Sequence, residues 1–264
     1  MYQFKTLKWS RHAAAGKPDG QACIGLLTLA RPDALNAIDV RMRVELDLIL
    51  DQIRRDDSLR VVIITGEGRG FSAGGDLRSE AAPLGALDTE NDFGDFGAYK
   101  ELANYFFNDL RHSVLQRCFK KLEDLPAITI AAINGPAVGI GLEICTLVDM
   151  RFASDKARLG EVAVPAGFLP ESGGARNLPK LIGVGKALDM ILTGKIVDAA
   201  EAERMGLVDR LIPCNLLPLA ADHLHRIAQT AVAVRQLTRG GALGAVRPAI
   251  DRAVPGGLLA DPHA

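Results

Sequence analysis

GEGRGFSAGGD, at residues 66–76, and NGPAVGIGLE, at residues 134–143, are the two stretches that decide the fold of this chain. Each follows a short apolar run, VVIIT at residues 61–65 and AITIAAI at residues 127–133. Continuous apolar runs of this length are typical of strands that are buried on both faces of a sheet. Glycine permits the unusual φ values and the close backbone approach that tight loops need. The sequence therefore predicts two buried strands, each followed by a glycine-rich loop.

The segments around these two strands alternate between extended and helical patterns. Asp39 is a candidate N-cap, and Met42, Leu46, Ile49 and Ile53 follow it at helical spacing. We expect further strands over residues 2–9, 23–30 and 151–153, and further helices over residues 99–122, 184–192, 199–205 (with Asp198 as N-cap) and 216–233. Residues 160–174 are expected to be irregular. Because strands alternate with helices and no linker or repeat interrupts them, the predicted fold class is α/β.

Composition excludes several classes of protein. The 264 residues are 48% hydrophobic and 24% charged, with a formal net charge of -1, which is too apolar for a disordered chain. The near-neutral charge argues against a nucleic-acid partner. We find neither a membrane-spanning run nor a secretory signal. Widely spaced cysteines are typical of reduced thiols, so we expect a cytoplasmic protein; they are Cys23, Cys118, Cys145 and Cys214.

A metal site is not expected from the sequence. His223 and His225 are two residues apart, so on a helix they would not share a face. Structural and catalytic metal sites need three or four converging ligands.

Four motifs in this order carry a family resemblance. RPDALNA at residues 31–37 precedes the two glycine-rich segments, and LTGKI at residues 192–196 follows them. The chain resembles the enoyl-CoA hydratase/isomerase, or crotonase, superfamily. The resemblance implies a crotonase-like spiral of ββα units over residues 1–210. It also implies a helical C-terminal segment of the same domain over residues 211–264, although five glycines after residue 239 depart from the helical pattern.

The resemblance implies chemistry on an acyl-CoA thioester, with no cofactor besides the coenzyme A of the substrate. Negative charge develops on the thioester oxygen, and two backbone N–H groups stabilise it. By the family pattern these belong to Ala73 and Ile140, where Ile140 replaces the usual glycine. The matching coenzyme A or substrate positions are Asn36, Ala37, Gly74, Gly75, Asp76, Leu77 and Gly139. The resemblance further implies a homotrimer or a dimer of trimers.

The acid–base residues are less complete than in the family pattern. Glu143 matches the first catalytic glutamate, whereas Ala163 occupies the position of the second. Glu161 and Glu171 are the nearby acids. We favour Glu171, because Glu161 would point to the opposite side if residues 160–164 were extended.

Three functions fit these residues. Hydration and dehydration of a 2-enoyl-CoA is the first, since two carboxylates serve water activation and protonation. The alternative is Δ3/Δ2 double-bond isomerisation by a single glutamate of raised pKa. A non-catalytic RNA-binding or scaffold role is the third. The acyl chain and the pathway do not follow from the sequence.

Overall fold

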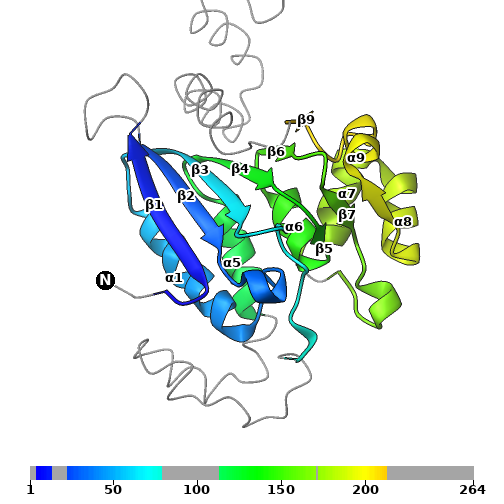
Figure 1. Cartoon of the computed structure of the whole chain (residues 1–264), viewed down its shortest axis with the longest axis horizontal. Coiled ribbons are helices and arrows are strands. Elements are labelled where there is room, and N and C mark those ends of the chain that lie inside the picture. Colours follow the sequence, from blue (N-terminus) through cyan, green and yellow to red (C-terminus); the bar gives the residue numbers. More distant parts are fainter. Residues whose placement is uncertain (1–3, 14–22, 79–112, 171, 213–264) are drawn as a thin grey trace, which may run out of the picture.

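The computed structural model describes residues 4–13, 23–78, 113–170 and 172–212 (Figure 1). The strands are β1 (Leu7–Ala13), β2 (Cys23–Leu29), β3 (Leu59–Gly66), β4 (Ile128–Ile133), β5 (Ala137–Val138), β6 (Met150–Ala153), β7 (Arg158–Gly160), β8 (Ile196–Asp198) and β9 (Arg210–Leu211). The α-helices are α1 (Val40–Arg54), α5 (Ser113–Glu123), α6 (Ile140–Leu147), α7 (Gly174–Ile182), α8 (Val184–Thr193) and α9 (Ala199–Met205). Two 3₁₀ turns are η1 (Pro32–Ala34) and η3 (Val164–Ala166).

Two sheets organise the described part of the chain. The larger has the order β1-β2-β3-β4-β6-β9, and the smaller has the order β5-β7-β8. Only the β1–β2 pair is antiparallel in the larger sheet; its other pairs are parallel. From β4 onward the chain places β4, β6 and β9 in the larger sheet and β5, β7 and β8 in the smaller. This repeated passage between sheets, with helices between, confirms the α/β class and fits the expected spiral of ββα units.

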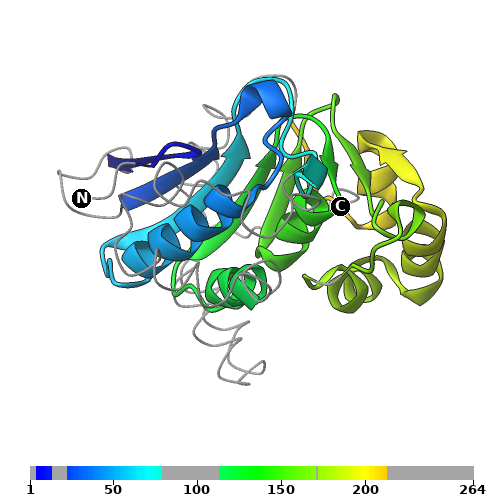
Figure 2. The ribbon, with the colours of Figure 1, turned by 90° about the horizontal axis from the view of Figure 1, so that it is seen from below.

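The helices α1, α5 and α6 lie on one face of the larger sheet (Figures 1 and 2). On β3, Val62 and Ile64 belong to the main core cluster, whereas Val61 and Ile63 belong to a second cluster. Successive side chains of a strand point to opposite faces, so β3 is buried on both faces as its apolar run predicts. No helix in the described part of the chain is long and apolar enough to cross a membrane.

The helix α1 buries charge as well as apolar surface. The Asp47 side chain is 1% exposed and forms ion pairs with Arg117 at 2.9 Å and with Lys121 at 2.8 Å. Both cations come from α5. The polar side of α1 is therefore an interface with α5, although its charge pattern alone is typical of a solvent-facing side.

Most boundaries of the predicted elements agree with the structure, whereas the short strands β5, β7, β8 and β9 are not predicted by the sequence. Asp39 caps α1 by accepting a hydrogen bond from the Met42 N–H at 2.8 Å, and Asp198 caps α9 in the same way. The first strand is displaced toward the C-terminus, and α7 lies partly in a region predicted to be irregular. The predicted helical residues 99–112 and the segment 213–264 lie outside the described residues.

The two glycine-rich loops form one unit. The N–H groups of Phe71 and Ser72 both donate to the Pro136 carbonyl at 3.0 Å, and the Val138 N–H donates to the Ser72 carbonyl at 3.1 Å. In the first turns of α6, a Cβ on Gly141 would lie 2.6 Å from the Ser72 carbonyl oxygen. Only a residue without a side chain permits this approach.

Gly141→Ala is predicted to lower the free energy of unfolding by roughly 1–3 kcal/mol, the usual range for overpacking. The added methyl group meets backbone, which cannot move as a side chain does. Urea denaturation of the purified variant measures the change.

Gly185→Ala is the matched control. Gly185 lies within α8, and a Cβ there would meet nothing within 4 Å. Because alanine is the better helix former, this variant should be more stable by up to about 1 kcal/mol. Equal destabilisation of both variants would contradict the argument from close approach.

Candidate active site

The glycine-rich loops, α6 and the chain after β7 line a cavity of about 300 Å³. Among the predicted site residues it gathers Ala73, Gly74, Gly75, Leu77, Gly139, Ile140 and Glu143. Asn36, Ala37 and Asp76 do not line it. Glu171 lies outside the described residues. The volume is within the range of small-molecule sites.

Glu143 enters the cavity from the first turn of α6. Glu143 is only 2% exposed. Its Oε1 accepts hydrogen bonds from the Ser172 N–H at 3.2 Å and from the Gly174 N–H at 2.9 Å. Backbone donors hold a carboxylate in one orientation and favour its charged form. Glu143 is therefore a fixed carboxylate within the cavity.

The prediction that the Ala73 N–H is an oxyanion donor is wrong. Its N–H donates to the Leu35 carbonyl at 2.9 Å, so it is already engaged. The segment around Ile38 pairs with the first loop. The Ile38 N–H donates to the Gly74 carbonyl, and the Asp76 N–H donates to the Ile38 carbonyl. In such a parallel bridge the N–H of the residue between the two points to the other side. That residue is Gly75, which lines the cavity.

Gly75 and Ile140 provide a candidate pair of donors. Ile140 is the first residue of α6, and N–H groups of a first helical turn have no intrahelical acceptor. The loops bring these amides close, since a Cβ on Gly74 would lie 3.5 Å from the Ile140 nitrogen. The chain has no positive φ at Ile140, so isoleucine fits here without backbone strain.

Asn36 supports the loops instead of contacting a ligand with its side chain. It is buried, its Nδ2 donates to the Glu67 and Gly70 carbonyls at 2.9 Å, and its Oδ1 accepts from the Arg31 N–H at 2.9 Å. Its side chain is thus used within the protein, and the predicted coenzyme A position of Asn36 stays a prediction. The positive φ of 56° at Asn36 is one that asparagine tolerates better than most residues.

The neighbouring predicted binding residues are also tied into this frame. The Ala37 carbonyl accepts from the Arg31 guanidinium at 2.5 Å, and the Asp76 carboxylate pairs with it at 3.0 Å. Arg31 also pairs with Asp39 at 3.2 Å. These polar groups hold the first glycine-rich loop against the start of α1, behind the cavity wall.

Glu161 is the residue that the sequence-based argument placed wrongly. It is 0% exposed and lines the cavity. The strand β7 ends at Gly160, and Ala163 has helical angles (φ -66°, ψ -49°) before η3 begins. The chain therefore turns after β7. The expectation that Glu161 points away is wrong for a simpler reason as well, because residues two apart on an extended segment, such as Glu161 and Ala163, point to the same side. Ala163 also lines the cavity but contributes no carboxylate.

The carboxyl groups of Glu161 and Glu143 approach the same point. A Cβ on Gly174 would lie 2.8 Å from Glu143 Oε1 and 2.9 Å from Glu161 Oε2. Neither oxygen of Glu161 forms a hydrogen bond of standard geometry to any described residue. Burial, and next the charge of Glu143, raise the pKa of Glu161 to about 8, while the nearby Ala163 amide lowers it by less. Glu161 is thus a carboxyl that holds its proton near neutral pH.

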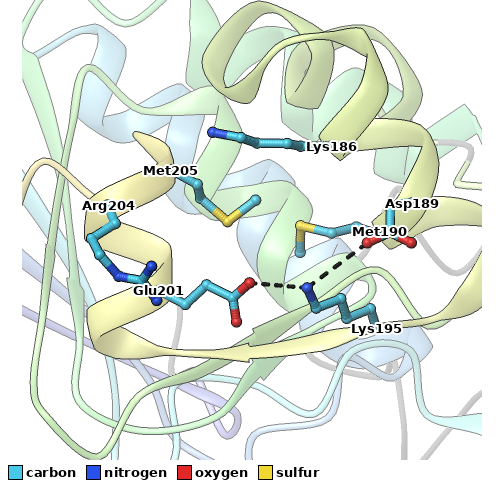
Figure 3. Close-up of a pocket in the computed structure, with 7 residues that line it drawn as sticks. All are labelled: Lys186, Asp189, Met190, Lys195, Glu201, Arg204 and Met205. Atoms are coloured by element: carbon cyan, nitrogen blue, oxygen red, sulfur yellow. Dashed lines mark hydrogen bonds and ion pairs between the residues drawn. The ribbon is translucent and has the colours of Figure 1, made fainter.

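A second cavity, of about 170 Å³, lies between α8 and α9, with Lys195 just before β8 in its wall (Figure 3). Met190 and Met205 point their sulfur atoms into it, and Lys195 pairs with Glu201 at 2.9 Å and with Asp189 at 3.8 Å. Its cations and anions largely compensate each other. Because it contains neither loop amides nor a buried carboxyl pair, it is not the candidate active site.

Comparison with known proteins assigns the chain to a family. A sequence model described as Enoyl-CoA hydratase/isomerase matches residues 19–240. The chain belongs to the enoyl-CoA hydratase/isomerase family. It is 34% identical over 235 residues to the probable enoyl-CoA hydratase echA8 of Mycobacterium tuberculosis (strain CDC 1551 / Oshkosh), covering 89% of this chain and 80% of that protein. It is 33% identical over 218 residues to the short-chain-enoyl-CoA hydratase of Clostridium acetobutylicum, covering 82% and 76%.

Solved structures of the family share the fold. An enoyl-CoA hydratase from Bacillus anthracis superimposes with a TM-score of 0.69 at 28% identity, over 94% of this chain and 89% of that one. A putative enoyl-CoA hydratase from Thermobifida fusca YX, in complex with acetoacetyl-CoA, gives a TM-score of 0.68 at 27% identity, over 94% and 92%. The crotonase-like fold that the motifs predict is therefore confirmed.

As the pH rises, the free energy of unfolding of the Glu161→Gln variant is predicted to become larger than that of the wild type. The folded state raises the pKa of Glu161 from 4.5 to about 8, so ionisation opposes folding. The wild type should lose stability between these two pH values and then level off, whereas glutamine stays neutral. The difference in unfolding free energy should reach a few kcal/mol, since one pKa unit corresponds to about 1.4 kcal/mol.

Urea unfolding at pH 4.5, 6, 7 and 9 measures this difference. Glu201→Gln, outside the candidate active site, is the control variant. The same pH dependence in both variants, or none in Glu161→Gln, would contradict the assignment of a buried, proton-holding carboxyl.

Proposed function

We propose that this protein hydrates 2-enoyl-CoA thioesters to 3-hydroxyacyl-CoA and catalyses the reverse dehydration. The observation that carries the proposal is the backbone-anchored carboxylate of Glu143 in one cavity with the N–H groups of Gly75 and Ile140. A base beside two amide donors suits a reaction through a thioester enolate. The relatives named as enoyl-CoA hydratases support this reaction over isomerisation.

The proposed first step uses both parts of the site. Glu143 takes a proton from water as the water oxygen forms its bond to Cβ. The electrons of the C=C bond then move toward the thioester oxygen, which accepts hydrogen bonds from Gly75 and Ile140. The N-terminus of α6 adds a favourable potential at this place, because the helix dipole is positive there. Charge develops where donors are already oriented, which lowers the barrier.

The substrate class has support beyond the site itself. A structural neighbour from Thermobifida fusca YX was solved in complex with acetoacetyl-CoA. We propose that the cavity accepts the acyl group of such a thioester, with Leu77 and Gly139 along its wall. No additional cofactor, assembly as a homotrimer or a dimer of trimers, and a cytoplasmic location remain predictions.

The decisive assay follows crotonyl-CoA and 3-butenoyl-CoA side by side in H₂¹⁸O. Hydration predicts 3-hydroxybutyryl-CoA that carries one ¹⁸O atom at C3. Conversion of 3-butenoyl-CoA to crotonyl-CoA, without hydration of either compound, would instead assign the isomerase reaction and overturn the proposal.

Glu143→Gln is predicted to lower kcat for crotonyl-CoA hydration by about 10²–10⁴-fold, the usual contribution of a general base. The amide keeps the shape but cannot accept the proton from water. Glu201→Gln, at the second cavity, is the matched control and should keep wild-type activity. Unchanged activity in Glu143→Gln would remove this residue from the reaction.

Ile140→Pro is predicted to lower kcat by about 10²–10³-fold, as loss of one oxyanion donor does. Proline lacks the N–H but is well tolerated at the first position of a helix. Ile140→Ala keeps the amide while it removes the side chain, and it should retain activity within about tenfold. Circular dichroism and thermal melting verify that both variants fold. Equal losses in the two variants would show that the side chain, and not the amide, matters.

A further inference from the structure

We propose that Glu161 is the second catalytic carboxyl of this enzyme, the acid that delivers a proton to Cα of the enolate. The proposal rests on the hydration reaction proposed above and adds to it a residue two positions before the one where the family pattern has its acid. Ala163, at the family position, lines the same cavity without an ionisable group. Glu161 thus supplies from a displaced position what Ala163 lacks.

The geometry brings the two carboxyl groups together at one glycine. Glu143 comes from α6, and Glu161 comes from the turn between β7 and η3, yet both reach the space above Gly174. Any side chain at Gly174 would meet the two carboxyl oxygens at 2.8 and 2.9 Å. The missing side chain keeps this space open, so both carboxyl groups can face one substrate.

The hydrogen bonding of the two groups differs in a way that separates their roles. Glu143 is anchored by two backbone N–H groups, which stabilise a negative charge. Glu161 is buried and forms no hydrogen bond of standard geometry to the described residues. Apart from the weak effect of the Ala163 amide, nothing offsets its burial, and a buried carboxyl of this kind is more stable in its neutral form, particularly beside a carboxylate. The arrangement therefore pairs a base with an acid before the substrate binds.

Charged groups around Glu161 agree with this division. Among the described residues that line the cavity, the ionisable ones are Glu143 on α6 and Arg43 on α1. The charge of Glu143 acts on Glu161 and raises its pKa, as burial does. Wild-type hydration should accordingly decline as the pH rises through about 8.

The complete step balances in atoms and charge. Water gives its hydroxyl to Cβ and one proton to Glu143. The enolate then collapses, Cα forms a bond to the proton of Glu161, and the C=O bond of the thioester is restored. Glu161 is left as a carboxylate and Glu143 as a carboxylic acid. Glu143 then releases its proton to solvent and Glu161 takes one up from solvent, which returns the site to its starting state.

The test compares wild type, Glu161→Gln, Glu161→Asp and Glu171→Gln. Glu161→Gln should lower kcat for crotonyl-CoA hydration by about 10²–10⁴-fold, while the Kd of acetoacetyl-CoA changes by less than about threefold. It should also abolish exchange of the Cα protons of butyryl-CoA with deuterated solvent. Glu161→Asp should recover part of the activity and keep the decline at alkaline pH, which a purely structural role would not produce.

The outcomes separate this inference from the proposed function. An active wild type whose kcat and Cα exchange survive in Glu161→Gln would overturn the inference alone. Loss of both in Glu171→Gln, with Glu161→Gln unaffected, would overturn it in favour of Glu171. A folded wild type that binds acetoacetyl-CoA but hydrates no enoyl-CoA would instead overturn the proposed function.

Discussion

The contact between the two glycine-rich loops is the constraint on which the site depends. Pro136 accepts hydrogen bonds from two successive N–H groups of the first loop, and Ser72 accepts one from the second. Gly141 allows α6 to begin against Ser72, where a methyl group would collide with the backbone. This contact brings the first loop at Gly74 to within van der Waals distance of the Ile140 nitrogen at the start of α6. It also directs the first turn of α6, and with it Glu143, into the cavity.

The frame behind the loops has its own polar support, made of residues that do not line the cavity. Asn36 connects the segment before α1 to the first loop through its side chain, and Arg31 joins Asp39 and Asp76 there. Buried groups of this kind need partners, because an unpaired polar group inside a protein costs free energy. Glu161 departs from that rule. It is buried with no hydrogen bond of standard geometry to the described residues, and an exception of this kind at a cavity is typical of a residue retained for function.

Features set by neighbouring residues in the sequence are predictable. Features set by tertiary packing, such as the orientation of a loop N–H group, are not. Asp39 and Asp198 were identified as N-caps because capping depends on residues only two or three positions away. The helix α7 was missed because Gly174 at its start and Pro179 within it are poor helix formers, and packing overrides that preference. The motif points to Ala73 as a donor, but which N–H faces the cavity depends on the isolated bridge between Ile38 and Gly75.

The sequence by itself determined the α/β class, the two buried strands with their glycine-rich loops, the family and the position of Glu143. All of these follow from apolar patterns, glycine spacing and motif order along the chain. Only the tertiary structure decided that Gly75, and not Ala73, presents its amide, and that Asn36 is a support. It alone brought Glu161 to Glu143, because the chain after β7 and the start of α6 meet at Gly174 only through the packing of separate elements. The proton affinity of Glu161 likewise arises from burial and from a neighbouring charge, which no local pattern encodes.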